Sequence, residues 1–200
     1  MDLLKEIEKN NYTVEYSKNG ARCYQNLKVI VNIQKNQIFA GKYLHKVCVG
    51  LNAEDLKCFE AELKIKLNKD LLDFYKRYNG FHLFSGAFDI FGFGRIFEDG
   101  YYLVSRESDI CLPYHLFDEN DGIINEEKFK IGVICYKPLY YDNKTGVVTL
   151  DKGEEVERWK NLDECIEDVY HRLYVQYLPN GVIKKQRIED EFIFNTPENL

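Results

Sequence analysis

Apolar residues recur three and four positions apart over residues 67–80, which is the spacing of one face of an α-helix. Charged residues occupy the opposite side, so the segment predicts an amphipathic surface helix. Asn68 or Asp70 can cap its start, and Asn79-Gly80 tolerates the left-handed backbone with which many helices end. The apolar stripe comprises Leu71, Leu72, Phe74, Tyr75 and Tyr78.

The same periodicity predicts three further helices. A short one covers residues 3–7, and a second begins at Asn52 with a stripe of Leu56, Phe59, Leu63 and Leu67. The last begins at Asn161, where Glu164 completes a capping box. Its apolar face consists of Ile166, Val169, Tyr170, Leu173 and Tyr177.

Alternating apolar and polar positions predict strands at residues 12–16, 27–33 and 43–49, with Lys18-Asn19-Gly20 as a hairpin turn. Residues 81–94 predict a turn followed by a strand that buries Phe88 and Ile90, with Phe84 as a third candidate. Two consecutive strands are expected within residues 131–135 and 139–150. The tail, residues 179–200, contains Phe192-Ile193-Phe194, which predicts either an edge strand or a frayed terminus.

The helix that ends in Tyr78-Asn79-Gly80, followed by a loop and the strand Phe88-Asp89-Ile90-Phe91-Gly92, resembles the core signature of the SUKH superfamily, the Smi/Knr-like proteins. A strand beginning Ile131-Gly132 and a hairpin with Asp142, Gly146 and Val147 continue the resemblance, and the order agrees over about residues 52–178. The chain departs from the family pattern at Leu67-Asn68, where Leu-Pro is usual, and in a longer segment at residues 99–130.

The order of elements and the resemblance together predict an α+β fold, a largely antiparallel sheet with helices packed on one face. At 200 residues the chain suits a single domain. We expect an N-terminal helix and strand extension over residues 1–50, a SUKH-like domain over 51–178 and a C-terminal tail over 179–200.

Composition narrows the function. The net charge of −6 disfavours direct binding to nucleic acid, whose phosphates would be repelled. The chain has no apolar run of membrane-spanning length and no signal-peptide pattern at its start, which predicts a cytoplasmic protein. The six cysteines form no C-x-x-C pair, so we expect reduced, packed thiols rather than a disulfide scaffold or zinc site.

Catalytic chemistry finds little support in the sequence. The four histidines are scattered, and none stands at a metal-ligand spacing. His171 is expected to be exposed on the closing helix. His82, in the signature loop, favours a backbone hydrogen bond over a catalytic role. We therefore expect no enzyme activity, no metal and no cofactor.

The resemblance implies an immunity protein, because bacterial SUKH proteins are mostly modules that bind and block a toxin. An acidic chain suits a basic nuclease or another toxin that acts on nucleic acid. The alternative is a regulatory scaffold, for example in the control of cell-wall synthesis. We expect a monomer or weak homodimer whose partner-binding residues are Asp118, Glu119, Asp121, Tyr101, Tyr102, Tyr114, Asp89 and His82.

Overall fold

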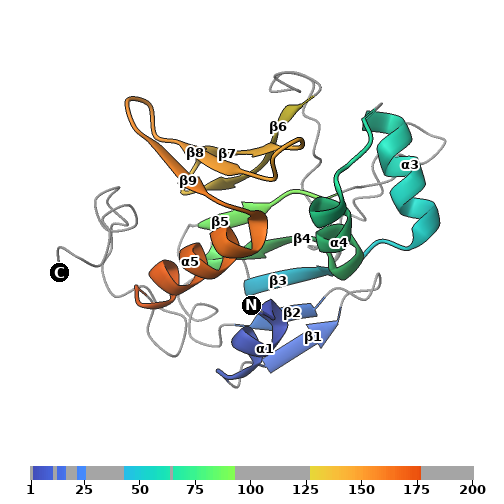
Figure 1. The fold of residues 1–200 in the computed structure, drawn as a ribbon. Coiled ribbons are helices and arrows are strands. Elements are labelled where there is room, and N and C mark those ends of the chain that lie inside the picture. Colours follow the sequence, from blue (N-terminus) through green and yellow to red (C-terminus); the bar gives the residue numbers. More distant parts are fainter. Residues whose placement is uncertain are drawn as a thin grey trace, which may run out of the picture.

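The computed structural model describes residues 2–10, 13–16, 22–25, 43–63, 65–92 and 127–176. These residues form a nine-stranded sheet in which each strand pairs antiparallel with the next one in the sequence (Figure 1). The strands are β1 (Thr13–Tyr16), β2 (Arg22–Gln25), β3 (Tyr43–Val49), β4 (Tyr78–Leu83), β5 (Phe88–Ile90), β6 (Lys128–Ile134), β7 (Lys137–Asp142), β8 (Val148–Asp151) and β9 (Val156–Trp159).

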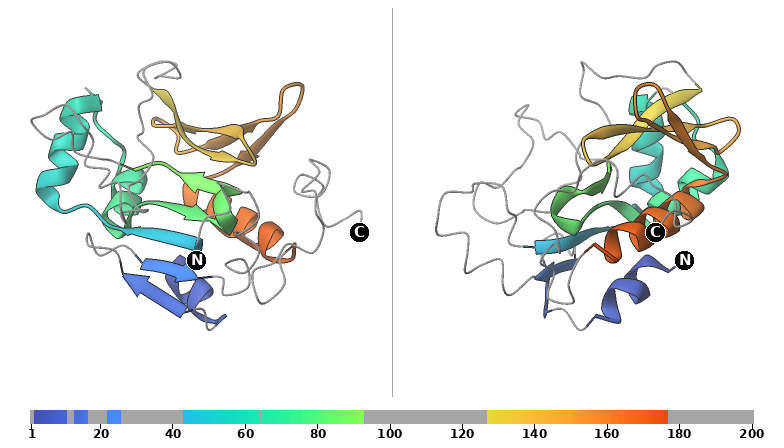
Figure 2. Two further views of the ribbon diagram at one scale, coloured as in Figure 1. Left: turned by 180° about the vertical axis from the view of Figure 1, so that it is seen from behind. Right: turned by 90° about the vertical axis from the view of Figure 1, so that its left-hand side faces the viewer.

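Helices cover one face of this sheet, which confirms the α+β fold predicted from the sequence (Figure 2). The turned views place α1, α4 and α5 on the same side, and α3 lies at one end beside α4. The helices are α1 (Leu3–Glu8), α3 (Ala53–Leu63), α4 (Lys69–Arg77) and α5 (Leu162–Tyr174), and the short 3-10 turn η1 spans Phe84–Gly86.

The core lies between the sheet and these helices as a single hydrophobic cluster. Phe74 of α4 packs edge-on against Phe81 of β4, with ring centroids 6.1 Å apart. Tyr170 of α5 lies 5.3 Å from Phe84 between centroids, and Leu3 and Ile7 bring α1 into the same core. Burial of the apolar helix stripes is therefore what holds the helices against the sheet.

Asn68 begins α4, as one of the two caps predicted from the sequence. Its Oδ1 accepts hydrogen bonds from the backbone N–H of Leu71 at 2.9 Å and from the hydroxyl of Tyr141 at 2.7 Å. Its own N–H donates to Oδ1 of Asn143 at 2.8 Å. Asn68 thus links α4 to the end of β7.

The predicted end of α4 is wrong. The helix stops at Arg77, and Tyr78 is already extended, with φ −142°. Asn79 and Gly80 belong to β4. The sequence pattern predicts a helix end at these two residues and a turn after them. Gly80 does have positive φ, +79°, but inside the strand, where a Cβ would lie 2.6 Å from the carbonyl oxygen of Ile90. The glycine is therefore required by the β4–β5 pairing rather than by a helix cap.

The Asp142 to Val147 hairpin forms as predicted. Asp142 Oδ1 accepts the N–H groups of Lys144 and Thr145, at 3.0 and 2.8 Å, and Gly146 has φ +78°. β9 was not predicted; it lies between this hairpin and α5. Asn161 caps α5 as expected, accepting from the N–H of Glu164 at 2.8 Å.

Some predicted features lie outside the described residues. They are the strand at 27–33, the turn at 18–20, Tyr177 and the tail at 179–200. None of the helices in the described part of the chain has the length and hydropathy needed to span a bilayer.

Candidate partner-binding site

Two of the predicted partner-binding residues, His82 and Asp89, are described by the structure, and they lie side by side. They are directly opposite each other in the β4–β5 register, and Nδ1 of His82 is 2.7 Å from Oδ1 of Asp89. The other six predicted residues lie outside the described residues, namely Tyr101, Tyr102, Tyr114, Asp118, Glu119 and Asp121.

The His82–Asp89 pair belongs to a polar row that crosses three strands. Lys46 of β3 is opposite His82 in the register, and Lys46 and Asp89 are both buried. The row faces away from α4, because the neighbouring residues Phe81 and Ile90 point into the helix-side core. A basic and an acidic group therefore flank His82 where water has little access.

Gly86 in η1 sets the space available to the His82 ring. A Cβ at this glycine would lie 2.7 Å from Cε1 of the imidazole, and Gly86 has φ +93°. The imidazole is thus held between Asp89 on one side and the η1 backbone on the other. This arrangement fixes the ring orientation, and the side chain keeps about one fifth of its surface exposed.

His45 is a second, fully buried histidine, on the helix side of the sheet. Its Nδ1 accepts the backbone N–H of Phe84 at 3.3 Å, and its ring lies 4.6 Å from that of Phe84. Burial, with a smaller contribution from the charge of His82, lowers the pKa of His45 to about 3. His45 is therefore neutral at physiological pH and acts as a core residue.

The remaining described cysteine, acidic and histidine side chains do not form a metal-binding group. Within the described ranges, no group of three or more His, Cys, Asp or Glu side chains is arranged to hold a metal ion. Cys48 and Cys165 are buried as free thiols, and burial raises the pKa of Cys165 well above its usual value. His171 is exposed on α5, as the sequence predicted.

The negative charge of the described chain is concentrated in residues 151–168, which comprise the end of β8, the β8–β9 turn, β9 and the first half of α5. We call this stretch the acidic segment. It contains eight acidic and three basic side chains. Those most exposed to solvent are Asp151, Glu154, Glu155, Asp163, Glu164 and Glu167.

A network of ion pairs and hydrogen bonds fixes β9, within the acidic segment, to α5. Arg172 binds Oε1 of Glu157 at 2.6 Å through Nη1, and its Nε donates to Oδ1 of Asp168 at 2.9 Å. The indole N–H of Trp159 donates to Oδ2 of Asp168 at 2.7 Å. These contacts hold β9 against α5, so the exposed carboxylates are presented on a preorganised frame.

Val156 and Tyr136 are exposed apolar side chains that the predicted contact residues did not include. Val156 of β9 is 52% exposed within the acidic segment, and Tyr136 is 96% exposed in the β6–β7 turn. Cys135 and Tyr136 both have left-handed backbone, with φ 47° and 67°. The clustering of acidic residues at 151–168 was readable in the sequence, whereas the exposure of Tyr136 depends on the turn conformation.

A sequence model of the SMI1 / KNR4 family (SUKH-1) matches residues 50–168, more than half of the chain. The protein therefore belongs to the SMI1 / KNR4 family, which confirms the resemblance seen in the α4–β5 and β6–β8 motifs. The match includes the His82–Asp89 pair and the acidic segment but not α1, β1, β2 or β3. No curated protein and no solved structure matches the chain.

Proposed function

We propose that this protein is a non-catalytic, cytoplasmic immunity protein that binds and neutralises a bacterial protein toxin. The supporting observation is the acidic segment, which lies on a rigid α5–β9 frame in a chain of the SMI1 / KNR4 family (SUKH-1). A toxin that acts on nucleic acid has a basic substrate groove, and carboxylates at fixed positions can occupy that groove in place of phosphates.

The contact residues of this proposal fall in two groups. The first is the exposed part of the acidic segment, with Val156 and Tyr136 as apolar contacts, because a tyrosine supplies both buried area and a hydrogen bond at an interface. The second comprises the residues proposed from sequence, which are Asp118, Glu119, Asp121, Tyr101, Tyr102, Tyr114, Asp89 and His82.

The first experiment is to purify the tagged protein from its native cells at low and high salt and to identify what co-purifies by mass spectrometry. The proposal predicts one basic partner that is lost at high salt and is toxic when expressed alone. Recovery of several signalling or wall-synthesis proteins instead would favour the regulatory scaffold and overturn the immunity role.

Charge reversal then locates the contact. Glu154→Lys with Glu155→Lys should weaken partner affinity at low salt by about tenfold or more, through a slower association rate. The matched control is Glu54→Lys with Asp70→Lys, which makes the same charge change on α3 and α4. Reversal of Asp118, Glu119 and Asp121 tests the loop separately. If no reversal changes the affinity, the proposed electrostatic contact is wrong.

A further inference from the structure

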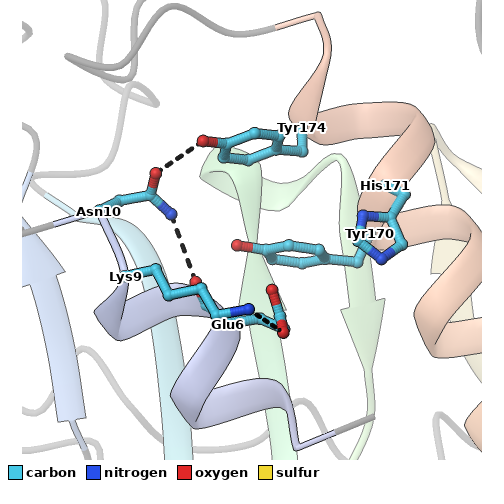
Figure 3. A pocket seen from close by; sticks show the side chains of 6 residues that line it. All are labelled: Glu6, Lys9, Asn10, Tyr170, His171 and Tyr174. Carbon is cyan, nitrogen blue, oxygen red and sulfur yellow. Dashed lines mark hydrogen bonds and ion pairs between the residues drawn. The ribbon is translucent and has the colours of Figure 1, made fainter.

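A cavity of about 230 Å³ lies between α1 and the C-terminal half of α5 (Figure 3). Its lining combines two parts of the chain that are far apart in sequence, and the hydroxyl of Tyr174 joins them by donating to Oδ1 of Asn10 at 2.7 Å. Because α1 precedes the matched family region, this cavity includes residues outside it. The lining residues are Glu6, Lys9, Asn10, Tyr170, His171 and Tyr174.

The walls of the cavity have the chemistry of a cation site. The rings of Tyr170 and Tyr174 are nearly parallel, at 18°, with centroids 6.0 Å apart, and α1 contributes the carboxylate of Glu6 opposite them (Figure 3). Electron-rich ring faces attract a cation, and a carboxylate can accept two parallel N–H groups of a guanidinium. Tyr174, which is 38% exposed at the rim, offers the accessible ring face, whereas Tyr170 is 2% exposed and stacks against it.

The size of the cavity indicates an amino-acid side chain rather than a cofactor. Small-molecule sites usually enclose about 300 to 1,000 Å³, so this cavity lies below that range. A planar guanidinium also stacks on tyrosine rings, which a compact ammonium does less well. Arginine therefore fits the combination of a carboxylate, aromatic faces and limited volume better than lysine.

Lys9 currently neutralises the carboxylate. Its Nζ lies 2.6 Å from Oε1 of Glu6, and its side chain is 66% exposed. An exposed ion pair of this kind contributes little stability, so an incoming guanidinium can displace it at small cost. Lys9 would then act as an internal competitor for the site.

We propose that the α1–α5 cavity binds an arginine side chain of a basic protein partner. That this partner is a toxin rests on the proposed function. That the cavity suits an arginine side chain rests only on the residues that line it. The acidic segment includes the N-terminal half of α5, and the cavity lies at the C-terminal end of the same helix. One basic partner that lies along α5 can therefore contact both.

The test uses N-acetyl-arginine methylamide as a probe and the citrulline analogue, a neutral isostere, as its control. The full-length protein is titrated by NMR, with the ring signals of Tyr170 and Tyr174 followed. The proposal predicts saturable shifts with the arginine probe and none with citrulline. Equal shifts with both probes, or none with either, would overturn it.

Two variants should change the affinity for the arginine probe in opposite directions, which a purely structural role of these residues would not produce. Glu6→Gln keeps the size of the side chain and should weaken arginine binding by about tenfold. Lys9→Gln removes the competitor and should tighten binding roughly threefold. Changes in the same direction in both variants would contradict the proposal. The titration contains no toxin, so its result does not depend on the proposed function. If the arginine probe binds but the purification yields no toxin, the arginine site stands and the immunity role is wrong.

Discussion

His82 and Asp89 face each other across the β4–β5 hairpin, with Nδ1 of the histidine 2.7 Å from Oδ1 of the aspartate. Asp89 is 7% exposed, and Lys46 follows in register on the other side of His82. A buried carboxylate depends on its neighbours rather than on water for compensation of its charge. Compensation of the Asp89 charge therefore depends on the β4–β5 register, which places His82 opposite it.

Asp89→Asn should lower the free energy of unfolding by about 1 to 3 kcal/mol, because the substitution removes the acceptor charge beside His82 while it keeps the side-chain shape. Urea unfolding followed by far-UV circular dichroism measures the change. Asp73→Asn is the matched control, since Asp73 forms an exposed pair with Lys76 and its loss should leave stability nearly unchanged. Equal effects in both variants would show that the buried pair is not special.

His45 should make the protein less stable as the pH falls. Its folded pKa of about 3 lies below its ordinary value of 6.5, so the unfolded chain binds a proton that the folded chain does not. Its contribution is constant above pH 6.5 and declines below it toward pH 3, by about 1.4 kcal/mol per pH unit.

The variant His45→Gln isolates this contribution, because it can still accept the N–H of Phe84 but does not titrate. Urea unfolding at several pH values between 7 and 4 should give a shallower loss of stability in the variant than in the wild type. Parallel curves would mean that His45 is not the group responsible for the loss of stability.

Gly80→Ala should be more damaging than Gly153→Ala. Both glycines have positive φ, +79° and +93°, but a Cβ at Gly80 would lie 2.6 Å from the oxygen of Ile90, whereas nothing lies within 4 Å at Gly153. We expect a loss of about 2 to 4 kcal/mol at Gly80 and about 1 kcal/mol at Gly153. Thermal unfolding of both variants tests this, and similar losses would rule out the steric explanation.

Tyr136→Gly should stabilise the fold relative to Tyr136→Ala by about 1 kcal/mol, because only glycine adopts φ 67° without strain. Both variants remove the exposed ring and should weaken partner binding to the same extent if Tyr136 is a contact residue. Chemical unfolding and affinity measurements on the same pair separate the two effects. Unchanged affinity in both would exclude Tyr136 from the interface.

Local signals in the sequence were enough to predict several elements. Asn68 and Asn161 cap their helices because a side-chain oxygen needs only the N–H groups three residues later. Asp142 and Gly146 form their turn for a similar reason, since all the partners lie within a few residues. The Asp142 to Gly146 turn also carries part of the family resemblance, whereas Asn68 stands at a position where the chain departs from it.

Longer-range features were decided by the tertiary structure. Asn79-Gly80 has the composition of a helix end, yet these residues lie in β4, which pairs with β3 on one side, from Tyr78, and with β5 on the other, from Phe81. His82 and Asp89 were both selected from the sequence, but their contact follows from strand register, which no local pattern specifies.

The sequence by itself determined the family, the helix stripes and the excess of negative charge, because each depends on residue identity and short spacing. Only the tertiary structure decided which charges neutralise one another and which residues share a cavity. Asn10 and Tyr174 are 164 positions apart, and their hydrogen bond exists because the core draws both α1 and α5 onto the same face of the sheet. Burial of apolar surface acts on the whole chain at once, and for that reason the site between these helices could not be read from either segment alone.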